Sequence, residues 1–214
     1  MSAAGATPGG APRLAGVRAL LAAFTPAEPN ESRDLARALA LLDGREDPFD
    51  RRSAAPGHFT ASAFVLHPTR AAVLLIAHAK LGRWLQPGGH FEPEDADVWA
   101  AAARECREEA GLDGLVPVLP ALFHLDIHPI PALRGEPAHE HFDLRVLLRA
   151  ATDVVAAGSD ASAARWVEVA ALIDAPLPGA IPPAWPAATP VGSAATPVGD
   201  ASIRRALRRL PPLG

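Results

Sequence analysis

Residues 89–112 read GHFEPEDADVWAAAARECREEAGL, an acidic loop led by glycine and followed by an alanine-rich run. The spacing predicts a helix over 97–110, with Asp97 as its N-cap and Gly111 at its C-terminal stop. Within this helix Glu105, Glu108 and Glu109 stand at i, i+3 and i+4, so their carboxylates project from one face. The stretch therefore predicts a helix with a concentrated acidic face.

Acidic residues gather in this stretch, because seven of the 24 Asp and Glu residues lie between Glu92 and Glu109. A solvated helix face is the simplest explanation. The other side of the helix is apolar and is expected to dock it in a fixed direction, through Val98, Trp99, Ala102 and Cys106. A turn at Gly88-Gly89 offers a backbone carbonyl nearby in the chain. Docked carboxylates with a carbonyl form a hard-oxygen site suited to Mg²⁺ or Mn²⁺.

The same stretch resembles the Nudix box, G-x5-E-x7-R-E-U-x-E-E-x-G-U, in which U is an apolar residue. Its second half, R-E-C-R-E-E-A-G-L over 104–112, matches every fixed position. The first half carries one additional residue, so the isolated Glu of the box falls on Asp95 counted from Gly89 and on Ala96 counted from Arg104. The candidates to replace that Glu are Glu94, Asp95 and Asp97.

The resemblance implies a Nudix-type α/β/α sandwich around a mixed sheet. It also implies a divalent-metal-dependent hydrolase that cleaves a pyrophosphate bond in a nucleoside diphosphate derivative or a related compound. The alternative is a non-catalytic Nudix-fold domain that binds a nucleotide or has a regulatory role. Such a domain would be marked by a broken R-E-x-x-E-E, and this motif is intact over 104–109.

The resemblance also assigns residues to roles. The expected ligands of Mg²⁺ (or Mn²⁺) are Glu105, Glu108, Glu109 and the carbonyl of Gly88 or Gly89. The expected catalytic residues are Glu105, Arg104 and Glu108, with Arg104 holding the carboxylates in place. The choice of general base stays open, because closely spaced carboxylates titrate as a coupled set. Cys106 occupies the apolar position of the box and is expected to pack, not to act as a nucleophile.

The composition limits the class of protein. Of the 214 residues, 49% are hydrophobic and 21% are charged, so the chain can bury a core. The net charge of −4 argues against a nucleic-acid partner, and the single cysteine excludes an intramolecular disulfide framework. Neither an apolar run that would span a bilayer nor a secretory signal is recognised, which predicts a cytoplasmic protein with no membrane partner. The expected partner is a small phosphorylated molecule, and a homodimer is compatible with the sequence.

Periodicity and proline content divide the chain into five parts. Residues 1–12 are expected to be a disordered N-terminus. Residues 13–57 are expected to form a helical N-terminal extension and linker, with two helices over 13–43. Strands within the expected Nudix domain, residues 58–175, are predicted over 58–66, 72–78, 122–130, 139–149 and 164–169. A Pro/Ala-rich linker over 176–199 precedes a C-terminal helix within 200–214 that is expected to dock on the Nudix domain.

Two of these strands alternate polar and apolar residues. If they pair, one sheet face carries His124, Asp126, His128, His139, His141, Asp143 and Arg145. The opposite face, with Phe142 and Leu144, is predicted to face the core. Three interpretations of the polar face are open: a solvated surface, a wall that binds substrate, or a transition-metal site from His139 and His141.

The substrate-binding wall is the sharpest of these hypotheses. The expected substrate-binding residues are His139, His141, Asp143 and Arg145 of this wall, together with Arg83 and His90 on either side of the Gly88-Gly89 turn. Trp84, next to Arg83, is expected to be a core residue.

Overall fold

The computed structural model describes residues 10–52, 55–78, 83–132, 136–158, 161–174 and 201–212. Residues 1–9 of the expected disordered N-terminus and the whole expected linker over 176–199 lie outside the described residues. Helices and strands follow one another in mixed order along the described part of the chain, so the α/β fold class predicted from the sequence is confirmed. None of the described helices is long and apolar enough to cross a membrane.

The chain divides into two compact units, each built from three segments. The first unit comprises residues 1–62, 88–102 and 119–146, and the second comprises 63–87, 103–118 and 147–214. Three elements contribute residues to both units: β1 (Gly57–Leu66), α3 (Val98–Ala110) and β7 (His139–Arg149).

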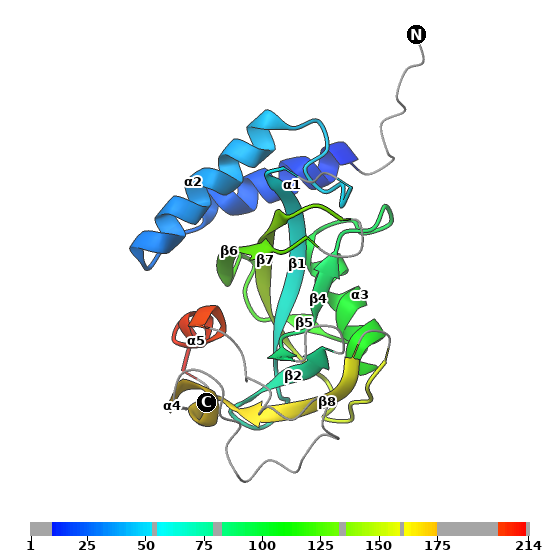
Figure 1. Ribbon diagram of the computed structural model, residues 1–214. Helices are drawn as coiled ribbons and strands as arrows, with labels where there is room; N and C mark the ends of the chain where they lie inside the picture. The colour runs from blue at the N-terminus through cyan, green and yellow to red at the C-terminus, as the bar shows by residue number, and fades with distance from the viewer. Residues whose placement is uncertain are drawn as a thin grey trace. The chain divides into compact units, whose positions relative to one another are not determined.

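The first unit holds the N-terminal helices and the polar strands. Its other elements are α1 (Gly10–Ala23), α2 (Pro29–Gly44), β4 (Gly88–His90) and β6 (His124–Ile130). Helix α1 packs against α2, and α2 packs against β6 (Figure 1). Strand β4 pairs with the first half of β1, and β6 pairs with β7, both antiparallel. The two predicted N-terminal helices are confirmed.

The second unit is organised around β2 (Ala72–His78). Its other elements are β3 (Arg83–Leu85), β5 (Val116–Pro117), β8 (Ala161–Glu168), α4 (Val169–Asp174) and α5 (Ala201–Leu207). Strand β2 pairs with β1, β3 and β8, and β5 pairs with β7, all antiparallel. Helix α5 packs on α4, and its apolar residues Ile203, Ala206 and Leu207 are buried.

The predicted turn at Gly88-Gly89 is wrong, because these two residues and His90 form β4. Ala61 of β1 lies opposite Gly89, and Ser62 lies opposite Gly88. A Cβ atom on Gly88 would lie 2.3 Å from the Cβ of Ser62, so only glycine lets β4 approach β1 this closely. A strand of three residues is too short to show an alternating pattern, which is why the sequence gives no strand signal here.

The predicted core side of β7 is confirmed. Phe142 and Leu144 are fully buried, and the Phe142 ring packs on that of Phe59 from β1 with 5.9 Å between ring centroids. Because side chains alternate along a strand, this packing directs the His, Asp and Arg residues of β7 to the other face.

Candidate active site

Both ends of α3 are fixed by local hydrogen bonds. At the N-terminus, Oδ1 of Asp97 accepts a 2.8 Å hydrogen bond from the backbone N–H of Ala100, which confirms Asp97 as the N-cap. At the C-terminus, Gly111 has a φ of 66°, and its N–H donates to the carbonyl of Arg107 at 3.0 Å. The N–H of Leu112 reaches back to the carbonyl of Cys106 at 3.4 Å. The bond from Gly111 to Arg107 is that of an αL-type helix end, whose positive φ explains why glycine follows the helix.

Arg104 connects two of the three predicted carboxylates on α3. Its Nη1 donates to Glu105 Oε1 at 3.0 Å and to Glu108 Oε2 at 3.1 Å. The Arg104 and Glu105 side chains are largely buried, at 11% and 13% exposed, whereas that of Glu108 is 41% exposed. One cation thus restrains two like charges that would otherwise repel each other at this spacing.

The third carboxylate, that of Glu109, is buried and lies near Cys106. Burial, with the charges of Glu109 and Glu105 adding to it, raises the pKa of the Cys106 thiol far above its ordinary value. The thiol therefore stays protonated and uncharged, which supports the packing role expected for Cys106. The backbone N–H of Gly158 donates to the Glu109 carbonyl at 3.1 Å, so the segment after β7 contacts the C-terminal end of α3.

The donor set of α3 fits a hard divalent cation. Glu105, Glu108 and Glu109 offer carboxylate oxygens, which are the ligands that Mg²⁺ and Mn²⁺ prefer. Among the described residues, however, these three do not form a set whose ligand atoms all lie within 4.8 Å of one another. Glu105 and Glu108 are instead engaged by Arg104, as described above.

The acidic loop before α3 is tied to the N-terminal helix α1. Asp95 is buried; its Oδ2 accepts from the N–H of Glu92 at 2.8 Å, and its own N–H donates to the Glu92 carbonyl at 3.1 Å. The Arg13 guanidinium of α1 donates to the carbonyls of Asp95, Glu92 and Pro93 at 2.9, 2.8 and 3.0 Å. The loop with the additional residue is thus held by an element outside the box, and Asp95 and Asp97 both have local structural roles.

The two polar strands pair antiparallel, and the predicted single polar face is confirmed. The opposed residues are His124 and Arg145, Asp126 and Asp143, His128 and His141, and Ile130 and His139. All seven polar residues therefore share one sheet face, as predicted.

Part of this face is buried, so it is not simply a solvated surface. His124, Asp126, Asp143 and Arg145 are each at most 4% exposed. Arg145 donates to Asp143 at 2.7 Å and to Asp126 at 3.2 Å. Asp143 also accepts from the hydroxyl of Ser62 at 2.8 Å. The structure therefore argues against the predicted direct contact of substrate with Asp143 and Arg145, because both are enclosed and paired with each other.

Helix α2 contributes the residues that meet this buried network. Glu31 Oε1 lies 3.5 Å from His124 Nε2, and Arg37 pairs with Glu140 of β7. Burial raises the pKa of Asp126, but Arg145 and the hydrogen-bonded His128 outweigh it and hold that pKa well below its usual range. Asp126 therefore stays ionised.

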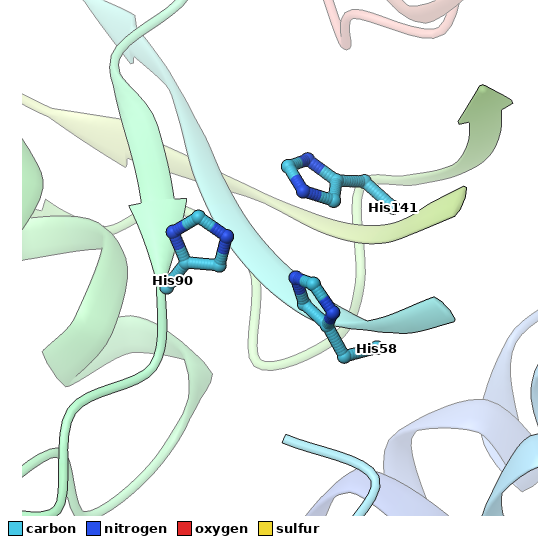
Figure 2. A group of neighbouring side chains, drawn as sticks. All are labelled: His58, His90 and His141. Atoms are coloured by element: carbon cyan, nitrogen blue, oxygen red, sulfur yellow. The ribbon is translucent and has the colours of Figure 1, made fainter. Parts of the chain in front are cut away.

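The remaining end of the polar face belongs to a cluster of five histidines: His58, His90, His128, His139 and His141. The His141 ring has the other four around it, with centroid distances between 5.0 and 5.6 Å. His58, His90 and His141 come from β1, β4 and β7, and Figure 2 shows their rings turned toward a common space. His58, fully buried, was not anticipated from the sequence.

Arg83 lies on a different strand from the histidines. It is exposed on β3, where it pairs opposite His78 of β2. The neighbouring Trp84 is buried, as predicted, and the Arg165 guanidinium stacks over its ring at 4.7 Å from the centroid.

These features define an α/β domain with an intact box helix, and the comparisons with known proteins agree. The NUDIX domain family matches residues 57–187, which is more than half of the chain. The chain therefore belongs to the NUDIX domain family.

Several solved structures are similar to this chain. An Ap4A hydrolase of C. elegans is 20% identical over 71% of this chain and 93% of its own, with a TM-score of 0.43. A MutT NUDIX hydrolase of Burkholderia pseudomallei is 20% identical over 72% of this chain and 97% of its own, with a TM-score of 0.45. The dihydroneopterin triphosphate pyrophosphohydrolase of E. coli is 16% identical over 54% and 83%, with a TM-score of 0.40. No curated protein matches the sequence.

Proposed function

We propose that this chain is a divalent-metal-dependent hydrolase of the cytoplasm that cleaves a pyrophosphate bond in a nucleoside diphosphate derivative or a related small phosphorylated compound. The observation that carries the proposal is the restraint of Glu105 and Glu108 by Arg104 on a helix with both ends fixed. A merely solvated helix face has no need of a largely buried guanidinium between its carboxylates.

The proposed ligands of Mg²⁺ or Mn²⁺ are Glu105, Glu108, Glu109 and the carbonyl of Gly89. When bound, such a cation neutralises phosphate charge and lowers the pKa of a bound water. Arg104 sets the spacing of Glu105 and Glu108 and prevents their mutual repulsion from turning them apart. Glu105 or Glu108 would accept the proton of the attacking water, and the choice between these two carboxylates stays open.

The proposed substrate contacts are made by residues that retain exposure. Arg83 is exposed, and His90, His139 and His141 are half-buried. Guanidinium and imidazole groups donate hydrogen bonds to phosphate and ribose oxygens. Asp143 and Arg145 act indirectly in this proposal, since their ion pair fixes the strand that carries His139 and His141.

The proposal is tested with a substrate panel and a metal series. The purified protein is incubated with ADP-ribose, NADH, nucleoside triphosphates, dinucleoside polyphosphates and nucleotide sugars, with Mg²⁺, with Mn²⁺ and with EDTA. Phosphate released after phosphatase treatment is measured for the parent, for Glu108→Gln and for the control Glu46→Gln, an exposed acid outside the box. We expect metal-dependent turnover that Glu108→Gln alone abolishes. Binding of panel compounds without any turnover would instead indicate the non-catalytic alternative.

A further inference from the structure

We propose that His58, His90 and His141 bind a transition-metal ion of the Zn²⁺ class, at a site whose ligands are distinct from the carboxylates of α3. This inference does not rest on the proposed hydrolase function. It concerns three strands of the first unit that bring one histidine each to the same place.

The three histidine rings meet at one place. One ligand nitrogen from each of the three rings lies within 4.8 Å of the other two. Nitrogens that share a tetrahedral Zn²⁺ ion at its usual bond length lie about 3.4 Å apart, so small ring rotations close the gap. The three rings come from separate strands and point inward together (Figure 2). Their ligand nitrogens converge, whereas those of rings lying side by side on a flat surface would not.

Close backbone contacts between the strands set this geometry. His90 is fixed opposite Thr60, two residues along β1 from His58, by the close approach of Gly88 to Ser62. The start of β1 also lies very close to β7, since a Cβ atom on Gly57 would be 1.9 Å from the carbonyl oxygen of Glu140. These contacts at Gly57 and Gly88 place the strands that carry His58, His90 and His141 without help from the side chains themselves.

A backbone carbonyl fixes the tautomer of His139, which lies next to His141. A carbonyl oxygen can only accept, so the 2.9 Å contact of His139 Nδ1 with the Pro137 carbonyl requires the proton to sit on Nδ1. In the neutral ring, Nε2 of His139 then carries a lone pair, and it lies 3.3 Å from Nε2 of His141. His139 lies outside the group of three rings whose ligand atoms are all within 4.8 Å of one another, so it borders the site through His141 and is not one of the proposed ligands.

The chemistry of the ligands selects among metal ions. An all-imidazole ligand set suits Zn²⁺, Co²⁺, Ni²⁺ or Cu²⁺, whereas Mg²⁺ takes oxygen ligands.

Substrate contacts made by His90, His139 and His141, as proposed above, do not account for His58. His58 is 0% exposed, so its ring is not available to a nucleotide-sized ligand, yet it joins the same group of nitrogens. An ion is small enough to reach a ligand at this depth, and the half-buried rings of His90 and His141 leave an approach from solvent.

The test uses the full chain without a polyhistidine tag. The EDTA-treated and dialysed protein is titrated with Co²⁺ and with Zn²⁺, and binding is followed by calorimetry and by the visible absorption of protein-bound Co²⁺. We expect one tight ion per chain, a Co²⁺ spectrum typical of low coordination number, and no displacement by excess Mg²⁺. Absence of tight binding in the parent protein, or displacement by Mg²⁺, would overturn the proposal without any variant.

The variants locate the ion. His90→Gln and His141→Gln, both at half-buried positions, are expected to weaken Co²⁺ binding by about 10²-fold or more, since even outer-shell changes cost 10- to 100-fold. The matched control is His78→Gln, a half-buried histidine of β2 in the second unit, which should bind as the parent does. Glu108→Gln should also retain Co²⁺ binding, which separates this site from the proposed α3 site. Unchanged binding in both cluster variants would contradict the assignment.

Discussion

The acidic face of α3 and the polar face of β6 and β7 are both rich in charge, but they are built differently. On α3, Arg104 holds Glu105 and Glu108, which lie one and four residues away, and Glu108 keeps 41% of its side chain exposed. On the strands, Arg145 holds Asp126 from 19 residues away, and every partner is buried. A local, partly exposed set of charges is available to a ligand, whereas a distant, buried set stabilises the fold. The predictions below test this division.

The largest expected effect is on stability, at the buried face. Arg145→Ala leaves Asp126 and Asp143 without their guanidinium partner, and breaking a buried pair costs about 3–5 kcal/mol. We expect the urea midpoint of unfolding to fall accordingly. The control is Arg52→Ala, which removes an 87% exposed partner of Asp50 and should change stability by less than about 0.5 kcal/mol. Equal effects of the two variants would show that the buried network is not stabilising.

The next effect is on turnover, at α3. Glu108→Gln keeps the shape of the side chain but removes a charged oxygen, so we expect turnover to fall about 10²-fold or more with unchanged unfolding. Steady-state kinetics at saturating Mg²⁺ and urea unfolding are measured on the same preparation. If Glu108→Gln destabilises the protein as Arg145→Ala does, the division between a chemical and a structural region fails.

The features of the fold and site that the sequence predicts are those set by neighbouring residues. The ends of α3 were predictable because Asp97 and Gly111 act on residues within one helical turn. The polar face of β6 and β7 was also predictable, because a two-residue alternation with Phe142 and Leu144 on the core side fixes which face is polar. Both signals are local patterns.

The rest depends on contacts between distant segments. The cluster of His58, His90 and His141 needs β4 to lie against β1, and a three-residue strand carries no periodic signal. The burial of the polar face likewise depends on α2, whose Glu31 and Asp34 look like ordinary solvated acids in the sequence. The domain boundaries at 57 and 175 and the roles of the site residues stay predictions.

A third, smaller effect is expected where the N-terminal extension meets the box loop. Arg13 donates to three loop carbonyls and lies 5.4 and 5.5 Å from the ring centroids of Phe49 and Phe91. We expect Arg13→Ala to destabilise the protein by about 2 kcal/mol and to increase proteolysis within residues 91–97. The control, Arg18→Ala, changes another arginine of α1 and removes its surface pair with Asp43 of α2. Identical cleavage rates in all three proteins would show that α1 does not restrain the loop.

The smallest effect is a gain of stability at Asp34, whose side chain is 5% exposed and accepts long hydrogen bonds, 3.4 Å each, from Nε and Nη2 of the mostly exposed Arg33. Burial, partly offset by Arg33, raises the pKa of Asp34 above 3.8, and the charge of Asp126 adds to the rise. The raised pKa means that the native state disfavours the charged carboxylate. Relative to the unfolded chain, stability is therefore fully present below pH 3.8 and is lost as the pH rises through the native pKa.

Asp34→Asn removes this charge and keeps the shape, so we expect a gain of up to about 1 kcal/mol at neutral pH. The gain should vanish below pH 3.8, where the carboxyl group is protonated in both states. Thermal unfolding across this pH range measures it, with Asp43→Asn, whose side chain is 66% exposed, as the control. A loss of stability at neutral pH in Asp34→Asn would mean that the charge of Asp34 supports the buried face, as that of Asp126 does, and that both carboxylates belong to one favourable network.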